Sequence, residues 1–162
     1  MMRRLELFIF CMLVWVVLTG SVNWQSVVSG VSVSLAVALV FGEGFAERPG
    51  QVLDPRRWWW FLVYAPVFFW EMTKANVDVA YRVLHPRMPI RPGIVKIRTR
   101  IKSEAGRVFL ANSITLTPGT LSVDLSGDVL YIHWIYVRET DMGKATEAII
   151  GRFESLIMKI FD

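Results

Sequence analysis

The chain has very few of the side chains from which most metal and cofactor sites are built. It contains one cysteine, Cys11, and two histidines among 162 residues. A lone thiol forms no intrachain disulfide and indicates no oxidising compartment, and a zinc site made of several cysteines and histidines is excluded. The glycines at 42, 44 and 50 match neither a phosphate-binding loop nor a dinucleotide fingerprint. Since no arrangement of nucleophile, acid and base appears either, we expect no enzyme, no cofactor and no metal.

Charge is missing from most of the N-terminal quarter. Between Glu6 and Glu43 there is no acidic, basic or histidine residue, and the whole chain is 54% hydrophobic, with a mean hydropathy of +0.43. Leu5–Val22 and Trp24–Gly42 are apolar runs of about 18 residues, enough to cross about 27 Å as helices. Because their connector is short and uncharged, they predict a transmembrane hairpin over residues 1–42. A cleavable signal peptide is the alternative for the first run, but no small-x-small cleavage site follows it.

Small residues recur at every fourth position of the second run: Ser26, Gly30, Ser34, Ala38 and Gly42. This spacing places them on one side of a helix, where a second backbone can approach closely. Small residues are common in membrane helices generally, but the strict register favours a helix-packing face. The first run carries the bulky Trp15 at matching spacing, so the pattern points to another subunit as the partner.

Basic residues indicate which way the hairpin crosses. Arg3 and Arg4 precede the first run, and the following loop carries Arg48, Arg56 and Arg57, whereas the connector between the runs carries none. Since cytoplasmic loops are enriched in lysine and arginine, we expect the N-terminus and this loop to be cytoplasmic. The C-terminus is expected on the same side.

The stretch Trp58–Leu84 joins an apolar start to a charged stripe. Its uninterrupted apolar part, Trp58–Trp70, would be about 20 Å long as a helix and too short to span. The charges that follow alternate in sign at helical spacing: Glu71, Lys74, Asp78 and Arg82. Such a stripe is most often a solvated or partner-contacting face. We favour a helix in the cytoplasmic interface, because crossing would place the basic segment 82–107 outside; the alternative is a third span whose acidic residues face partner subunits.

The C-terminal part predicts a small cytoplasmic domain. Prolines at 86, 89 and 92 make residues 85–93 a stiff linker. Residues 94–162 then indicate a β-α-β-β-α order. The first strand, 94–101, alternates apolar residues with Lys96, Arg98 and Arg100, which gives it one basic side that is solvated or faces lipid headgroups. A short helix capped by Ser103 is expected to reach Ala111.

A strand hairpin and a long helix complete this domain. The hairpin spans residues 120–137, and its second strand, Val129–Val137, is so apolar that we expect cover on both faces. The last helix, 141–160, shows one continuous apolar stripe, with Glu154 among the charges on its other side. The expected fold class is therefore an α+β membrane protein, divided into residues 1–42, 43–93 and 94–162.

One long motif lies across these elements. Residues 112–120 read Asn-Ser-Ile-Thr-Leu-Thr-Pro-Gly-Thr, and residues 130–135 read Leu-Tyr-Ile-His-Trp-Ile. With the apolar N-terminal half and the small polar C-terminal half, this run resembles the MrpE family (also MnhE or PhaE), which contributes one of the subunits of multisubunit monovalent cation/proton antiporters. The motif residues are Asn112, Ser113, Thr115, Thr117, Pro118, Gly119, Thr120, His133 and Trp134.

The resemblance implies a subunit of a large complex in the bacterial cell membrane that exchanges Na+ or another monovalent cation for protons. Its partners would be other integral-membrane subunits and the lipid bilayer, with no nucleic acid. Because the two spans lack charged residues, we expect an accessory scaffold that supports exchange without forming the ion path. Two alternatives stay open: a membrane-arm subunit of an energy-converting hydrogenase-like complex, and a free-standing anchored domain that binds anionic lipid through its basic strand.

The motif itself allows two chemical interpretations. His133 could relay protons near neutral pH, but no carboxylate lies near it in the sequence, so we favour an interior imidazole bonded to backbone or hydroxyl groups. Thr115, Thr117 and Thr120 could hold an anion beside the backbone amides of the turn. The simpler interpretation is that they satisfy turn hydrogen bonds.

Overall fold

The computed structural model describes residues 2–44 and 54–162. Contacts divide the chain into two compact units, Met1–Pro55 and Arg56–Asp162. Arg48 and most of the predicted loop that carries it lie outside the described residues.

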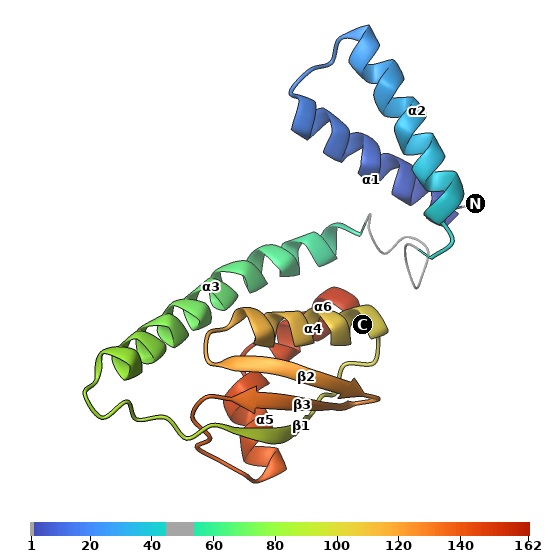
Figure 1. Cartoon of the computed structure of the whole chain (residues 1–162). Coiled ribbons are helices and arrows are strands. Elements are labelled where there is room, and N and C mark those ends of the chain that lie inside the picture. Colours follow the sequence, from blue (N-terminus) through green and yellow to red (C-terminus); the bar gives the residue numbers. More distant parts are fainter. Residues whose placement is uncertain (1, 45–53) are drawn as a thin grey trace. The chain divides into compact units, whose positions relative to one another are not determined.

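The N-terminal unit is a helical hairpin of α1 (Met2–Thr19) and α2 (Trp24–Phe41) (Figure 1). Gly20, with φ of +57°, ends α1 three residues before the predicted limit of the first run. Asn23 begins α2 by accepting a 2.8 Å hydrogen bond from the Ser26 amide. Among the described helices, α2 meets the length and composition expected of a membrane span, while α1 carries two arginines and a glutamate in its first turns.

The small-residue face of α2 lies against α1. Gly30, Ser34, Ala38 and Gly42 are buried, and Ser26 is half-buried. The Trp15 indole donates to the Ser26 carbonyl and hydroxyl at 3.0 and 3.2 Å. A Cβ atom on Gly30 would come within 2.6 Å of the Trp15 ring. The sequence had suggested that Trp15 is too bulky to lie against this face and that another subunit packs there. The structure accommodates the Trp15 ring inside the hairpin because residue 30 is a glycine.

The C-terminal unit contains a long helix, α3 (Pro55–Leu84), followed by a small mixed domain. Its strands are β1 (Gly93–Arg98), β2 (Thr120–Ser126) and β3 (Val129–Trp134), and its helices are α4 (Glu104–Leu116), α5 (Met142–Ile150) and α6 (Glu154–Phe161). The strands form one antiparallel sheet in the order β1-β3-β2. Helices cover one face of this sheet, with α4 beside β2 and α5 beside β1 (Figure 1).

The core of this domain lies between the sheet and its helices. It is formed by fully buried aliphatic side chains, among them Ile97, Leu110, Ile114, Leu130, Ile132, Ile150 and Ile157. The prediction that β3 is covered on both faces is wrong. Leu130 and Ile132 are buried, whereas Val129 and Tyr131 are half-buried and His133 is exposed. The apolar run had suggested two-sided cover, but helices pack against only one side of the strand.

Two helix boundaries also differ from expectation. α4 continues five residues beyond Ala111, so the first half of the motif is helical. The last helix is broken at residues 151–153 into α5 and α6. Ile150 before the break and Ile157 after it are fully buried, whereas Ile149 and Leu156 are only partly buried, so the inward face lies one residue away from the predicted stripe. Glu154, expected on the polar side, is thereby buried.

The packing of Trp15 on Gly30 gives a first prediction. Gly30→Leu should weaken the hairpin by about 1–3 kcal/mol, because the new side chain and the indole would occupy the same space. The yield of assembled membrane complex on native gels should fall. Val31→Leu and Val33→Leu, at exposed positions of the same helix, serve as matched controls and should assemble normally. Equal yields from all three variants would contradict the close packing.

Candidate functional site

The charged stripe of α3 faces the domain that follows it in the chain. The Glu71 carboxylate accepts bonds from Arg152 at 2.8 and 3.0 Å and from Lys74 at 2.7 Å. Burial raises the pKa of Glu71, but the hydrogen bonds from Lys74 and Arg152 outweigh it, so the pKa lies below its usual value. Glu71 therefore stays ionised and joins α3 to the connection between α5 and α6.

A second ionic contact lies two turns further along α3. The Arg82 guanidinium donates to Asp78 at 2.8 and 3.0 Å and to the Pro89 carbonyl at 2.6 Å. It also stacks 4.1 Å from the centre of the Tyr136 ring. Arg138 approaches Asp78 at 3.5 Å. The hydrogen bond from Arg82 lowers the pKa of Asp78 below its usual value, so this carboxylate too is held in its charged form.

Aromatic side chains extend the same contact towards the start of α3. Tyr64 is buried, packs 5.2 Å from the Phe109 ring, and donates a 2.7 Å hydrogen bond to the Ser113 hydroxyl. Ser113 in turn donates to the Phe109 carbonyl. Lys159 of α6 lies 3.9 Å from the centre of the Trp60 ring. We call this continuous contact the α3 seam; it comprises Trp60, Tyr64, Glu71, Asp78 and Arg82 with their partners on the domain.

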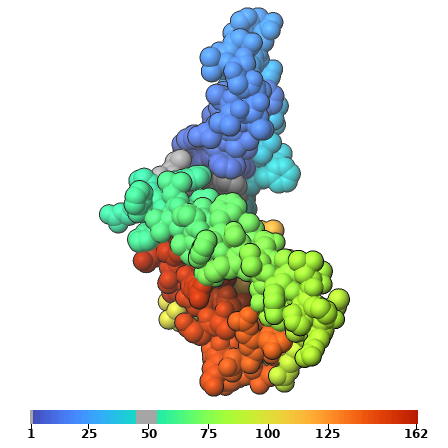
Figure 2. Space-filling view, turned by 90° about the vertical axis from the view of Figure 1, so that its left-hand side faces the viewer, coloured from blue at the N-terminus to red at the C-terminus, as the bar shows by residue number. Residues whose placement is uncertain are grey.

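The opposite side of α3 is uncovered in this unit. Figure 2 shows α3, in teal to light green, lying across the domain with its outer side open. The large exposed side chains of this outer face are Trp59, Leu62, Phe69, Trp70, Val77, Tyr81 and Leu84. The stripe of charges thus contacts the domain of the same unit, although Lys74 and Asp78 are still partly exposed, and an aromatic-rich face lies on the other side of the helix.

The hydroxyl groups of the motif serve the turn from α4 into β2. Thr117 donates to the Ser113 carbonyl at 2.9 Å, and Thr120 donates to the Ile114 and Thr117 carbonyls at 2.7 and 2.9 Å. Thr115 donates to the Ala111 carbonyl and accepts from the Ser122 amide. The hydroxyls of Thr117 and Thr120 thus satisfy carbonyls that the helix end leaves free, while Thr115 joins α4 to β2. These are the turn hydrogen bonds of the simpler interpretation. Asn112 is exposed on α4.

Gly119 is the point where this turn meets α3. Its φ of +89° lies in the left-handed region that favours glycine. A Cβ atom there would lie 2.9 Å from Ile135 and 3.3 Å from Val79 of α3. Pro118 and Gly119 thus form a tight corner against the long helix, while Trp134 pairs with Thr120 across the sheet.

His133 does not occupy the interior position that the sequence suggested. It is exposed on the open face of the sheet, opposite Ile94 on β1 and Leu121 on β2. The strand alternation explains this, because Ile132 and Trp134 take the inward direction. Within the described residues, no cluster of three or more histidine, cysteine, aspartate or glutamate side chains could hold a metal ion.

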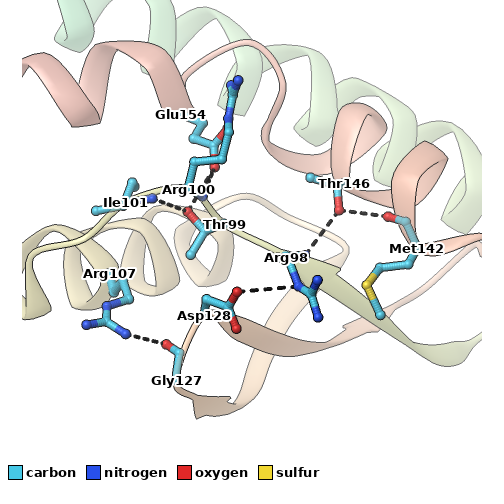
Figure 3. A network of polar contacts seen from close by, with 10 residues as sticks. All are labelled: Arg98, Thr99, Arg100, Ile101, Arg107, Gly127, Asp128, Met142, Thr146 and Glu154. Carbon is cyan, nitrogen blue, oxygen red and sulfur yellow. Dashed lines mark hydrogen bonds and ion pairs between the residues drawn. The ribbon is translucent and has the colours of Figure 1, made fainter.

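Sequence reasoning missed a buried carboxylate at the start of α6. Glu154 accepts hydrogen bonds from the Thr99 hydroxyl at 2.9 Å and the Arg100 amide at 2.7 Å. Its second oxygen accepts from the Arg100 guanidinium at 3.0 and 2.9 Å (Figure 3). The position in the first turn of α6 also favours a negative charge. This clamp ties the end of β1 to α6. The sequence signals for the break were Gly151, which ends α5, and the acidic Glu154 that follows it in the first turn of a new helix.

The geometry defines a class of protein: a helical hairpin with no acidic, basic or histidine residue between Glu6 and Glu43, followed by a unit with a small α+β domain. Carboxylates at positions 71, 78 and 154 of that unit are paired with its own arginines. Residues 8–160 match the family described as Na+/H+ ion antiporter subunit, MNHE. The chain belongs to this family, as the motif had indicated. It is a transporter component of the membrane rather than a catalytic enzyme.

Individual relatives support this membership. The chain is 35% identical to an Na(+)/H(+) antiporter subunit of Staphylococcus haemolyticus, over 88% of this chain and 86% of that protein. It is 39% identical to the corresponding Na(+)/H(+) antiporter subunit of Alkalihalophilus pseudofirmus, over 65% of this chain and 66% of that protein. A chain in the solved structure of the membrane-bound sulfane sulfur reductase (MBS), an archaeal respiratory membrane complex, is 43% identical, with a TM-score of 0.90 over 99% of this chain and 100% of that one.

The clamp yields a second prediction. Glu154→Ala should destabilise the chain by about 2–3 kcal/mol. The substitution removes hydrogen bonds to a charged group, and the buried Thr99 hydroxyl loses the acceptor of its hydrogen bond. Thermal unfolding of the full chain in mild detergent, followed by circular dichroism, measures the effect. Arg98→Gln is the control, since the Arg98–Asp128 pair is exposed on both sides and is worth about 0–1 kcal/mol. A Glu154→Ala variant as stable as Arg98→Gln would refute the clamp.

Proposed function

We propose that this chain is an accessory subunit of a multisubunit monovalent cation/proton antiporter, and that it supports exchange without forming the ion path. The observation that carries the proposal is the placement of charge. Between Glu6 and Glu43 the hairpin has no acidic, basic or histidine residue, whereas ion paths in membranes are built from such residues at depth. The acidic residues of the α3 seam are held by arginines of the same unit.

The second part of the proposal concerns α3, which we place in the cytoplasmic membrane interface. Its seam face contacts the domain from Trp60 to Arg82, nearly the whole length of the helix. A crossing helix would have to draw this polar domain into hydrocarbon, at a prohibitive desolvation cost. Tryptophan and tyrosine on the outer face suit the headgroup region. The interfacial alternative is therefore favoured over a third span.

It follows that the hairpin crosses the membrane twice and that both termini are cytoplasmic. The domain then lies beneath the membrane. The eight lysines and arginines between residues 82 and 107, in the linker and the start of the domain, are then cytoplasmic, as the positive-inside rule requires. The partners would be the ion-conducting integral-membrane subunits and the bilayer itself.

A second candidate function has a specific observation in its favour. The match to the archaeal respiratory complex covers nearly the whole chain at 43% identity, so membership in a redox-linked membrane arm is the alternative. Purification through a tag on this chain, in mild detergent, separates the two. Large multi-span subunits and sodium-dependent proton movement after reconstitution support the antiporter, while redox-cofactor subunits without such exchange support the respiratory complex.

The topology gives a third prediction. Single cysteines at the exposed positions Ser126 and Ser155, in a Cys11→Ala background, should resist an impermeant thiol reagent in intact cells and react after permeabilisation. A cysteine at Val22, in the connector between α1 and α2, is the matched control and should react in intact cells. Labelling of Ser126→Cys or Ser155→Cys without permeabilisation would favour a third span.

A further inference from the structure

The two edge strands of the sheet, β1 and β2, differ in how far their outward backbone groups are protected. β2 is protected in two ways: a register shift interrupts it between Ser122 and Asp124, and the Thr115 hydroxyl accepts a hydrogen bond from the Ser122 amide at 3.1 Å. Proteins commonly protect edge strands by such devices, because exposed backbone groups invite pairing with another chain. The β1 edge has less protection.

The hydrogen bonds at both ends of β1 show which of its amides point outward. Arg91 and Thr99 donate towards the β3 side, to the Ile135 and Asp128 carbonyls at 3.0 and 2.8 Å. By the alternation of a strand, the amides of Ile94, Lys96 and Arg98 point away from β3. Thr146 captures the Arg98 amide at 3.1 Å (Figure 3). Ile94 and Lys96 are left without a comparable cap among the described residues.

A groove of about 420 Å³ runs along this uncapped part of the edge. One wall is the segment Arg91–Lys96, and the other is formed by Val137, Thr140 and Met142. Arg91 and Lys96 are exposed at its two ends. The Lys96 ammonium lies 5.3 Å from the centre of the Tyr131 ring. The groove thus offers backbone donors and acceptors, an apolar wall and positive charge.

We propose that β1 receives an extended segment of another subunit as a fourth strand of the sheet. Strand addition supplies main-chain hydrogen bonds as the source of affinity, and side-chain pockets as the source of selectivity. The positive ends and apolar wall select a segment with acidic residues flanking apolar ones. The proposal rests on membership in a subunit complex, and not on the proposal that this chain carries no ions.

Backbone hydrogen exchange in the purified complex tests the proposal directly. The amides of Ile94 and Lys96 should exchange more slowly in the complex than in the isolated chain in the same detergent. Lys96→Pro removes the outward amide while leaving the β1–β3 ladder intact, so it should weaken retention in the complex about tenfold. Lys96→Gln, which keeps the amide, is the matched control for the lost charge and should lose less.

The results of these experiments distinguish a failure of strand addition from a failure of the subunit assignment. Partners that copurify while Ile94 and Lys96 exchange equally fast in both states would overturn strand addition but leave the subunit assignment standing. Absence of any copurifying subunit would instead contradict membership in a complex. A photoreactive residue at Thr140 that crosslinks to an acidic segment of a copurified subunit supports the proposal, whereas a crosslink to a second copy of this chain overturns it.

Discussion

The contact between α3 and its own domain is the constraint on which most other features depend. The salt bridges from Arg152 to Glu71 and from Arg138 to Asp78, the stacking of Arg82 on Tyr136 and the aromatic contacts at Tyr64 fix one face of a 30-residue helix to a polar domain. Desolvating those ion pairs would cost several kcal/mol per ion, so the bonded face stays at the domain. The remaining aromatic face of α3 is then the natural surface for the membrane interface.

Inside the domain, the buried carboxylate of Glu154 is also stabilised by its partners. Glu154 is almost fully buried, yet each of its oxygens receives two hydrogen bonds. A buried charge is tolerated only when it is satisfied in this way. Glu154 lies at the start of α6, directly after the break, and its hydrogen bonds to Thr99 and Arg100 lock the end of β1. The carboxylates of this unit at positions 71, 78 and 154 are therefore engaged in holding elements together, and this agrees with a supporting role in a complex.

Periodicity in the sequence was enough to predict the hairpin, the charged stripe, the alternation of β1 and the order of strands and helices. It was insufficient wherever a contact between distant segments decided the outcome. The apolar run around Ile132 predicted burial on both faces, since no local pattern shows that the helices cover one side only. The stripe from Glu71 to Arg82 did not reveal that its partners lie at Arg138 and Arg152. Trp15 seemed too bulky for close packing until its position over Gly30 was known. Glu154 was expected at the surface because one apolar stripe, through Phe153 and Leu156, places it on the polar side, although Gly151 marks the end of α5.

The central claim is that these charges support the complex without carrying ions, and it is tested most directly by exchange per assembled complex. The rate is measured in everted vesicles with a fluorescent pH indicator and divided by the amount of intact complex. Glu71→Gln and Asp78→Asn should leave this ratio unchanged even if the amount of complex falls, and Arg152→Gln, which breaks the Glu71 pair from the other side, should behave as Glu71→Gln does. A fully assembled but inactive Glu71→Gln or Asp78→Asn complex, beside an active Arg152→Gln complex, would contradict the account and put α3 on the ion path.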